Sequence, residues 1–211
     1  MYLTKTPDFV QNMFPNLIWK MKNEVTKSLY LSFDDGPIPE ITPWVLDQLD
    51  KYDAKASFFC VGQNVKSNPA IFRRLKANGH SIGNHTYDHL SGWKTSNLDY
   101  FRNVRYCDEL VDSTLFRPPY GRLKNKQALY LQRNYKVVMW DILSGDFDPK
   151  ITKEECLENV ISKATNGSII VFHDSLKAKE KLEYVLPRVL KHFSKLGYRF
   201  KNLESVKEYK S

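Results

Sequence analysis

The segment Leu29-Tyr30-Leu31-Ser32-Phe33 leads directly into Asp34-Asp35-Gly36-Pro37, so a short apolar run ends in two adjacent carboxylates and a turn. The apolar run is typical of a buried β-strand, and Gly-Pro is a common turn signal. Residues from about Ile41 to Tyr52 have the apolar spacing of a helix. This strand-turn-helix unit predicts an α/β fold.

The same alternation continues along the chain. Further strands are expected at 56–61, 80–83, 115–117, 136–141, 168–172 and 198–201, and further helices at about 68–78, 97–112, 126–134, 157–164 and 182–193. Pro187 should lie in the first turn of the last helix or kink it. About seven strands and six helices fall short of the eightfold repeat of a complete barrel, so we expect a distorted or incomplete (β/α) barrel.

Composition indicates an ordinary globular chain. Of 211 residues, 42% are hydrophobic and 27% are charged, with 32 Lys and Arg against 24 Asp and Glu, for a net charge of +8. No apolar run approaches the roughly 18 residues that a membrane span needs. Because the basic residues are scattered among acidic ones, nucleic-acid binding is an alternative that we do not expect.

The three cysteines, Cys60, Cys107 and Cys156, lack any CxxC spacing and are expected to be reduced and mostly buried. Residues 1–27 carry no apolar region of the kind found in secretory signals. We therefore expect a protein of the cytoplasm or of the inner face of the membrane, unless a leader is missing from the sequence, in which case it would be extracellular.

Residues 1–27 are expected to form an extension that packs on a single domain spanning 28–211. The apolar spacing from Phe9 to Trp19, broken at Pro15, predicts an edge helix. A foot on a membrane surface is the alternative for this segment.

Rare polar residues fall where the expected strands end. These residues are Asp34, Asp35, His85, His89, Arg117, Asp146 and His173. In a (β/α) barrel the loops at the carboxyl ends of the strands meet on one face, where active sites lie. The sequence therefore predicts that carboxylates, imidazoles and a guanidinium share one rim.

His85 and His89 are four residues apart, so on a helical turn they would face the same way. Neutral imidazoles at this spacing suit zinc or a similar divalent metal. The spacing by itself is a weak signal. It gains weight because the chain has only five histidines in all. His80 and His192 are expected to be structural or surface residues.

Asp34 and Asp35 would repel each other if both were buried without compensation. A metal bound to one carboxylate and an arginine paired with the other would remove that cost. An ordinary turn before Gly36 and Pro37 is the alternative for this motif.

Five ordered motifs resemble those of the polysaccharide deacetylases, carbohydrate esterase family 4, with its NodB homology domain. The motifs are Ser32 to Pro37, His85 to His89, Arg117 to Gly121, Trp140 to Phe147 and Val171 to His173. The resemblance spans about Leu29 to Val206, nearly the whole chain.

The resemblance implies a metal-dependent hydrolase. Asp35, His85 and His89 match the ligands of a divalent metal, with zinc expected and cobalt, nickel or manganese left open. Asp34 matches the general base, and Arg117 matches the residue that orients and charge-balances this base.

The other side of the site follows from the same resemblance. His173 matches the general acid, Asp146 the aspartate that tunes it, and the backbone N–H of Tyr120 an oxyanion donor. The residues implied to contact substrate come from the same motifs: Pro119, Tyr120, Phe147 and Val171.

Three positions depart from the usual family pattern. Leu143 stands where a further Asp is frequent, Phe147 replaces a common Trp, and Val171 replaces a common Leu. These changes should reshape the hydrophobic wall around the acetyl methyl group and the sugar, without removing a catalytic role.

The resemblance implies removal of N-acetyl groups from an N-acetylglucosamine-type polysaccharide, oligosaccharide or lipid-linked sugar, with release of acetate. One alternative is an O-acetyl esterase acting on acetylated polysaccharide such as xylan. Another is a non-catalytic sugar-binding relative. The partner is therefore an acetylated carbohydrate, and the oligomeric state is left open, with a monomer as the expectation.

Overall fold

The computed structural model describes residues 2–22 and 24–204, so the end of the expected catalytic domain, residues 205–211, lies outside the described residues. The strands are β1 (Ser28–Asp34), β2 (Ser57–Cys60), β3 (Ser81–Asn84), β4 (Leu115–Phe116), β5 (Lys136–Val137), β6 (Ile142–Leu143), β7 (Ile169–His173) and β8 (Arg199–Phe200). Their order is β5-β4-β3-β2-β1-β7-β6, with β8 paired to β1 and every pairing parallel. This curled parallel sheet confirms the expected distorted (β/α) barrel.

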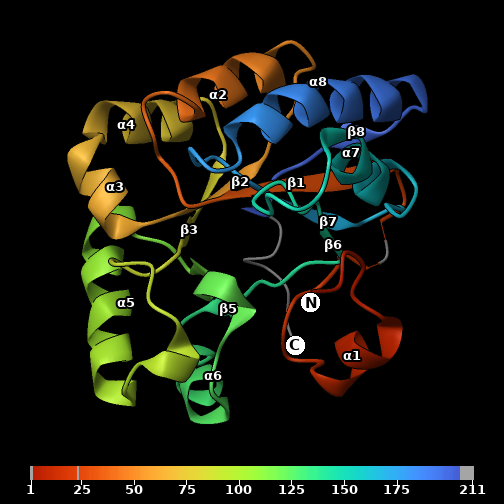
Figure 1. Cartoon of the computed structure of the whole chain (residues 1–211). Helices are drawn as coiled ribbons and strands as arrows, with labels where there is room; N and C mark the ends of the chain where they lie inside the picture. Colours follow the sequence, from red (N-terminus) through yellow and green to blue (C-terminus); the bar gives the residue numbers. More distant parts are fainter. Residues whose placement is uncertain (1, 23, 205–211) are drawn as a thin grey trace.

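Helices cover the outside of the sheet (Figure 1). They are α1 (Asp8–Met13), α2 (Thr42–Asp50), α3 (Gly62–Ser67), α4 (Pro69–Ala77), α5 (Asn97–Val111), α6 (Asn125–Leu131), α7 (Lys153–Ile161) and α8 (Lys179–Lys195). The sequence analysis missed α3. α8 begins at Lys179, three residues before the expected start, so Pro187 lies inside the helix; of the two expectations for Pro187, the first-turn position is wrong.

Local sequence explains where several helices begin. α7 begins with a capping box, in which Thr152 Oγ1 accepts from the Glu155 N–H at 3.1 Å and the Glu155 carboxylate accepts from the Thr152 N–H at 2.7 Å. Ser96 Oγ caps α5 by accepting from the Asp99 N–H at 3.2 Å. Pro69 opens α4, where its missing N–H costs no helical hydrogen bond.

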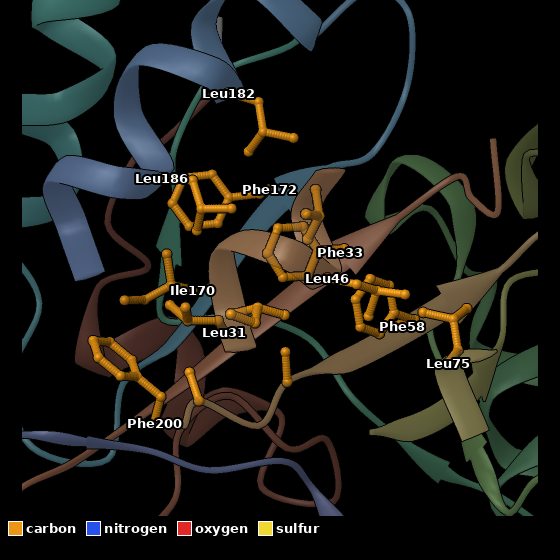
Figure 2. Close-up of a cluster of buried hydrophobic side chains, with 14 of the residues drawn as sticks. Leu31, Phe33, Leu46, Phe58, Leu75, Ile170, Phe172, Leu182, Leu186 and Phe200 are labelled. Carbon is orange, nitrogen blue, oxygen red and sulfur yellow. The ribbon is translucent and has the colours of Figure 1, made fainter. Parts of the chain in front are cut away.

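A large apolar core lies between the sheet and the helices α2, α4, α7 and α8. Leu31 and Phe33 of β1 point into it, as do Phe172 of β7 and Leu186 of α8 (Figure 2). Alternate residues of β1 point the other way, where Tyr30 packs inside the barrel in a second cluster. The period of two therefore gives each strand one face toward the helices and one toward the barrel interior.

The barrel stays open between its edge strands, β5 and β6. The sequence analysis predicted one strand over 136–141, but the chain bends after Val137 and forms β6 as a separate strand. Residues of the N-terminal extension pair with this region: the Leu143 N–H donates to Thr4 O at 2.9 Å, and the Ile18 N–H donates to Val137 O at 2.9 Å. The extension therefore supplies backbone partners along the opening.

The short helix of the extension, α1, packs less than its apolar spacing suggests. No residue of α1 is buried, and Phe9 and Met13 are 66% and 65% exposed. Leu17, Ile18 and Trp19 beyond the helix do pack against the barrel clusters. The expected packing of the helix face is thus wrong, because backbone pairing and the segment after Pro15 carry the contact instead.

A buried carboxylate also holds the extension. Asp141 is fully buried and accepts hydrogen bonds from Lys5 Nζ at 2.8 Å, Ser168 Oγ at 2.5 Å and Gln11 Nε2 at 3.2 Å.

We expect Lys5→Met to lower the free energy of unfolding by about 2 kcal/mol. This loss is smaller than that for a fully buried ion pair, because Lys5 is partly exposed. Urea unfolding measures the loss, and Lys191→Met on the outside of α8 is the control; equal stability of both variants would contradict the expectation.

Two further expectations can be compared with the structure. Cys60, Cys107 and Cys156 are all buried and free, as predicted. Among the described residues, no helix is long and apolar enough to cross a membrane.

Candidate active site

The carboxyl ends of β1, β3, β4 and β7 carry the predicted site residues. Asp34 has the same parity as Tyr30 on β1, so its side chain enters the barrel interior. Asp34 lies level with His173 in the β1–β7 register. The structure therefore brings residues from distant parts of the sequence to one end of the barrel.

Arg117 is fully buried beneath this end of the barrel. Its Nη1 donates to Asp34 Oδ1 at 2.7 Å and to Ser32 Oγ at 2.8 Å, and its guanidinium lies 4.0 Å from the centroid of the Phe59 ring. Its Nε donates to the backbone oxygen of Val138 at 3.2 Å, and its Nη2 donates to that of Met139 at 2.9 Å. The arginine thus fixes one oxygen of Asp34 and leaves the other facing His85.

Asp35, His85 and His89 present one oxygen and two nitrogens within 4.8 Å of one another. Asp35 Oδ1 lies 3.2 Å from His89 Nε2 and 3.9 Å from His85 Nε2. This oxygen is buried, yet it accepts no well-formed hydrogen bond from the described residues. A buried acceptor left unsatisfied among two imidazole nitrogens is the arrangement expected of an Asp/His/His metal site.

The tautomer of His85 supports the same assignment. His85 Nδ1 lies 2.7 Å from the carbonyl oxygen of Arg117, which can only accept, so Nδ1 carries the proton and the Nε2 lone pair faces Asp35. Burial lowers the pKa of His85 to about 4, although the carboxylates of Asp34 and Asp35 act in the opposite direction. A neutral imidazole with a free lone pair is the form that binds a metal.

In contrast to the neutral imidazole of His85, the carboxyl group of Asp35 is ionised. Burial would raise its pKa, but the imidazoles of His89, His173 and His85 outweigh burial and hold the pKa of this carboxyl well below its usual value. The donor set at neutral pH is therefore one carboxylate with at least one neutral imidazole, and these residues fit a divalent cation such as zinc.

The two histidines converge through a loop and not through a helical turn. Thr86 and His89 have φ angles of 62° and 55°, in the left-handed region that side chains other than glycine rarely adopt. The expectation of one helical turn was wrong, because these two residues reverse the chain locally. Asp88 anchors the loop by accepting from Asn103 Nδ2 at 2.5 Å and from Gln63 Nε2.

The turn after β1 is held by Asp174, which directly follows the neighbouring strand β7. The Gly36 N–H donates to Asp174 Oδ1 at 3.0 Å, and Thr42 Oγ1 donates to Asp174 Oδ2 at 2.5 Å. A Cβ at Gly36 would lie 2.0 Å from Asp174 Oδ2, so glycine is required for this approach. Asp35, the residue before it, has a φ of 86°. The contact with Asp174 thereby helps to orient Asp35.

His173 lies at the end of β7 in contact with Asp146. Its Nδ1 is 2.8 Å from Asp146 Oδ1, and its backbone N–H donates to Asp146 Oδ2 at 2.7 Å. Burial would lower the pKa of His173, but the Asp146 carboxylate, with smaller contributions from Asp35 and Asp34, outweighs burial and raises the pKa to about 9. The imidazole is therefore protonated at neutral pH, with Nε2 available to donate.

The remaining predicted site residues differ in how close they lie to these histidines and in how exposed they are. The Phe147 ring lies 5.1 Å from the His173 ring, and Tyr120 is 61% exposed with its ring 4.6 Å from the His89 ring. Pro119 is buried beside Tyr120, and Val171 is buried on the barrel side of β7, two residues before His173. Of the other histidines, His80 is buried and accepts from the Ala56 N–H at 3.2 Å.

Several residues of the site have no clear signal in the sequence. Phe59 under Arg117, Asn103 behind the histidine loop and Asp174 beside Gly36 act through contacts between distant segments. Ser32 could have been found, since it lies two residues before Asp34 and therefore on the same face of β1.

Comparison with known proteins adds to this geometry. The sequence pattern of the family described as polysaccharide deacetylase matches residues 21–140. The chain is 32% identical over 204 residues to a peptidoglycan-N-acetylglucosamine deacetylase of Bacillus cereus, covering 91% of this chain and 93% of that protein. It is 33% identical over 162 residues to a chitooligosaccharide deacetylase of Azorhizobium caulinodans, covering 72% and 76%.

The fold agrees with these relatives. The crystal structure of the Bc1960 peptidoglycan N-acetylglucosamine deacetylase superposes with a TM-score of 0.80 at 28% identity, covering 90% of this chain and 91% of that chain. The segment matched by the family pattern contains the Asp34 turn, the histidine loop and Arg117, while Asp146 and His173 follow it. The chain therefore belongs to the polysaccharide deacetylases, carbohydrate esterase family 4, and is a carbohydrate deacetylase.

Proposed function

We propose that the protein is a metal-dependent hydrolase that removes N-acetyl groups from N-acetylglucosamine-containing glycans and releases acetate. The observation that carries the proposal is an Asp/His/His cluster flanked by two oriented groups, the Asp34 carboxylate held by Arg117 and the His173 imidazole held by Asp146. The names of the Bacillus cereus and Azorhizobium relatives, which refer to N-acetylglucosamine and chitooligosaccharide, support this substrate class.

Asp34 is suited to remove a proton from the attacking water. Its Oδ1 is held by Arg117 at 2.7 Å, so its Oδ2, 4.0 Å from His85 Nε2, is the oxygen directed toward the cluster. A base that is oriented by a guanidinium loses little orientational freedom when the water arrives. Arg117 also balances the negative charge that Asp34 and Asp35 bring to the same small volume.

A divalent cation held by Asp35, His85 and His89 would polarise the acetyl carbonyl and increase the acidity of a water molecule. The chain contributes to the same polarisation if the backbone N–H of Tyr120 donates to the developing oxyanion. Tyr120 has a φ of 61°, a conformation that a non-glycine residue keeps only when the surroundings enforce it.

His173 is suited to protonate the amine as the carbon–nitrogen bond breaks. An amine leaves poorly without a proton, and the Asp146 carboxylate keeps the imidazole charged up to about pH 9. Because Nδ1 faces Asp146, the proton is delivered from Nε2. Phe147 packs against the edge of the imidazole and limits the access of water to it.

Measurement of acetate release tests the proposal. Chitin oligomers, peptidoglycan fragments and acetylated xylan are each incubated with protein of measured metal content. We expect acetate from the first two and little from xylan. Release from xylan alone would favour the O-acetyl esterase, and release from none of the three would favour the non-catalytic alternative.

Asp146→Asn tests the assignment of the acid. The native folded-state pKa of His173 is raised, so its proton is present below about pH 9 and lost above it. Without the carboxylate charge, burial dominates and the pKa of His173 falls. We expect the alkaline limit of kcat to move to lower pH, with a loss of about 100-fold at pH 8. A profile that weakens equally at every pH would contradict this role, and Asp148→Asn, in the following turn, is the control.

The location of the enzyme remains a prediction. A cytoplasmic or inner-membrane-associated enzyme would meet a lipid-linked or soluble acetylated sugar, whereas an extracellular one would meet the finished wall polymer. Fractionation of cells that make the native protein, with detection by antibody, distinguishes these locations.

A further inference from the structure

A groove of about 630 Å³, which we name the lateral groove, lies beside the candidate active site. Four parts of the chain line it: the N-terminal extension, the loop around Trp93 with the start of α5, the segment from Gly121 into α6, and Met139 between β5 and β6. The lining residues are Phe14, Leu17, Trp19, Trp93, Asn97, Gly121, Leu123, Lys124, Asn125, Lys126, Ala128 and Met139. None of the functions assigned above uses this groove.

A row of neighbouring side chains leads from the active site to the lateral groove. The His89 ring lies 4.6 Å from the Tyr120 ring, and the Arg122 guanidinium lies 6.0 Å from the Tyr120 ring centroid and 5.3 Å from that of Trp93. Trp93 then lines the groove, as does Gly121, the neighbour of Tyr120. A chain-like substrate with its acetyl group at His89 can therefore extend past Tyr120 into the groove.

The groove is lined by aromatic rings that are accessible to a ligand. Trp93 is 61% exposed and Phe14 is 43% exposed. Hydrogen bonds to main-chain oxygens hold the two tryptophan rings: Trp93 Nε1 donates to Leu123 O at 3.3 Å, and Trp19 Nε1 donates to Phe14 O at 3.1 Å. Exposed, fixed aromatic rings are suited to cover the apolar C–H face of a pyranose ring.

The charge of the groove is of one sign. Lys124 and Lys126 line it, and Arg122 lies over Trp93 at its edge, whereas no Asp or Glu is among its lining residues. Lys124 Nζ donates to Thr95 O at 2.7 Å, which holds this ammonium group in place. An uncompensated cationic wall favours a ligand that carries a carboxylate or a phosphate.

We propose that the lateral groove binds a further sugar unit of the glycan, one that carries an anionic substituent, and so makes the protein selective for anionic oligosaccharides. The proposal rests on the proposed function, because it assumes that the same glycan occupies the active site. Under this proposal, the N-terminal extension is part of substrate recognition through Phe14 and Trp19.

Binding measured without turnover tests the aromatic contribution. Isothermal titration uses a peptidoglycan tetrasaccharide freed of its peptides, which keeps only the lactyl carboxylates, and neutral chitotetraose as the second probe. We expect Phe14→Ala and Trp93→Ala each to weaken binding of the anionic tetrasaccharide by about tenfold, because each variant removes an aromatic face that would cover a sugar ring. Phe9→Ala is the matched control, an exposed aromatic residue of the same extension that lies outside the groove.

Charge reversal tests the anionic preference. We expect the native protein to bind the anionic tetrasaccharide more tightly than chitotetraose. Lys126→Glu should remove most of this difference and leave chitotetraose binding nearly unchanged, whereas Lys191→Glu on α8 should leave both unchanged. Equal affinity of the native protein for the two probes, or loss of binding in Lys191→Glu equal to that in Lys126→Glu, would overturn the proposal.

The two proposals fail in different ways. If no acetyl substrate is turned over but Phe14→Ala and Lys126→Glu still weaken tetrasaccharide binding selectively, the proposed reaction is wrong and the groove assignment stands. If acetate is released but kcat/KM for tetrasaccharides is the same in native protein and Phe14→Ala, the groove assignment is wrong and the reaction stands.

Discussion

Asp34→Asn is expected to lower kcat for deacetylation by about 10³-fold, within the range known for loss of a general base. The amide has the shape of the carboxylate and its oxygen can still accept from Arg117 Nη1, which lies 2.7 Å from Asp34 Oδ1 in the native protein. It cannot take a proton from water at neutral pH. Acetate release measured under saturating substrate gives the change in kcat directly.

Two measurements make this result specific to proton transfer. Bound metal and the melting temperature should both stay near the native values, because Asp34 is not one of the three clustered donors. Asp53→Asn is the matched control: Asp53 is exposed, has a φ of 47° that asparagine also tolerates, and is not among the predicted site residues. Retention of more than about a tenth of native activity in Asp34→Asn would contradict its role as base.

His89→Ala is expected to reduce zinc affinity by more than about 100-fold, beyond the 10- to 100-fold losses that follow removal of groups behind a ligand. His89 Nε2 is the nitrogen nearest Asp35 Oδ1, at 3.2 Å, and without it the cluster retains one imidazole and one carboxylate. Equilibrium dialysis with zinc, followed by elemental analysis, measures the loss without reference to activity. Turnover should fall in parallel.

A second variant and a control complete the metal experiment. Asp35→Asn keeps the left-handed backbone, which asparagine tolerates, and replaces the charged donor by a neutral one, so it should also bind zinc poorly. His192→Ala removes an exposed histidine of α8 and should leave zinc stoichiometry unchanged. Zinc binding by His89→Ala equal to that of the native protein would show that the cluster is not the metal site.

The local pattern of the sequence was sufficient to predict most of the fold and to predict which residues lie together at the carboxyl end of the barrel. Strand-length apolar runs alternating with helical spacing predicted the parallel sheet, and polar residues just beyond these runs predicted Asp34, His85, Arg117 and His173 at one end of it. Both inferences depend on short-range periodicity, which reports the face on which each side chain lies. Periodicity failed where the chain changes direction, as in the unpredicted bend between β5 and β6.

The geometry of the site depends on contacts that no local pattern contains. The histidine loop turns through left-handed residues held by Asn103, and the Asp35 turn is held by Asp174, which is 138 positions from Gly36 in the chain. Each contact joins residues of different elements, so it exists only when the tertiary structure brings those elements together. Burial then sets the protonation states, lowering the pKa of His85 and allowing Asp146 to raise that of His173.

The identity and order of the candidate site residues could thus be predicted from the sequence, because each of them follows a strand that is recognisable from its local apolar pattern. Their convergence, their charge states and the lateral groove arise only in the folded chain. The groove is the clearest case: Phe14, Trp93 and Lys126 come from an extension, a loop and a helix that share no periodic pattern. Only packing of the extension along the opening of the barrel brings them together.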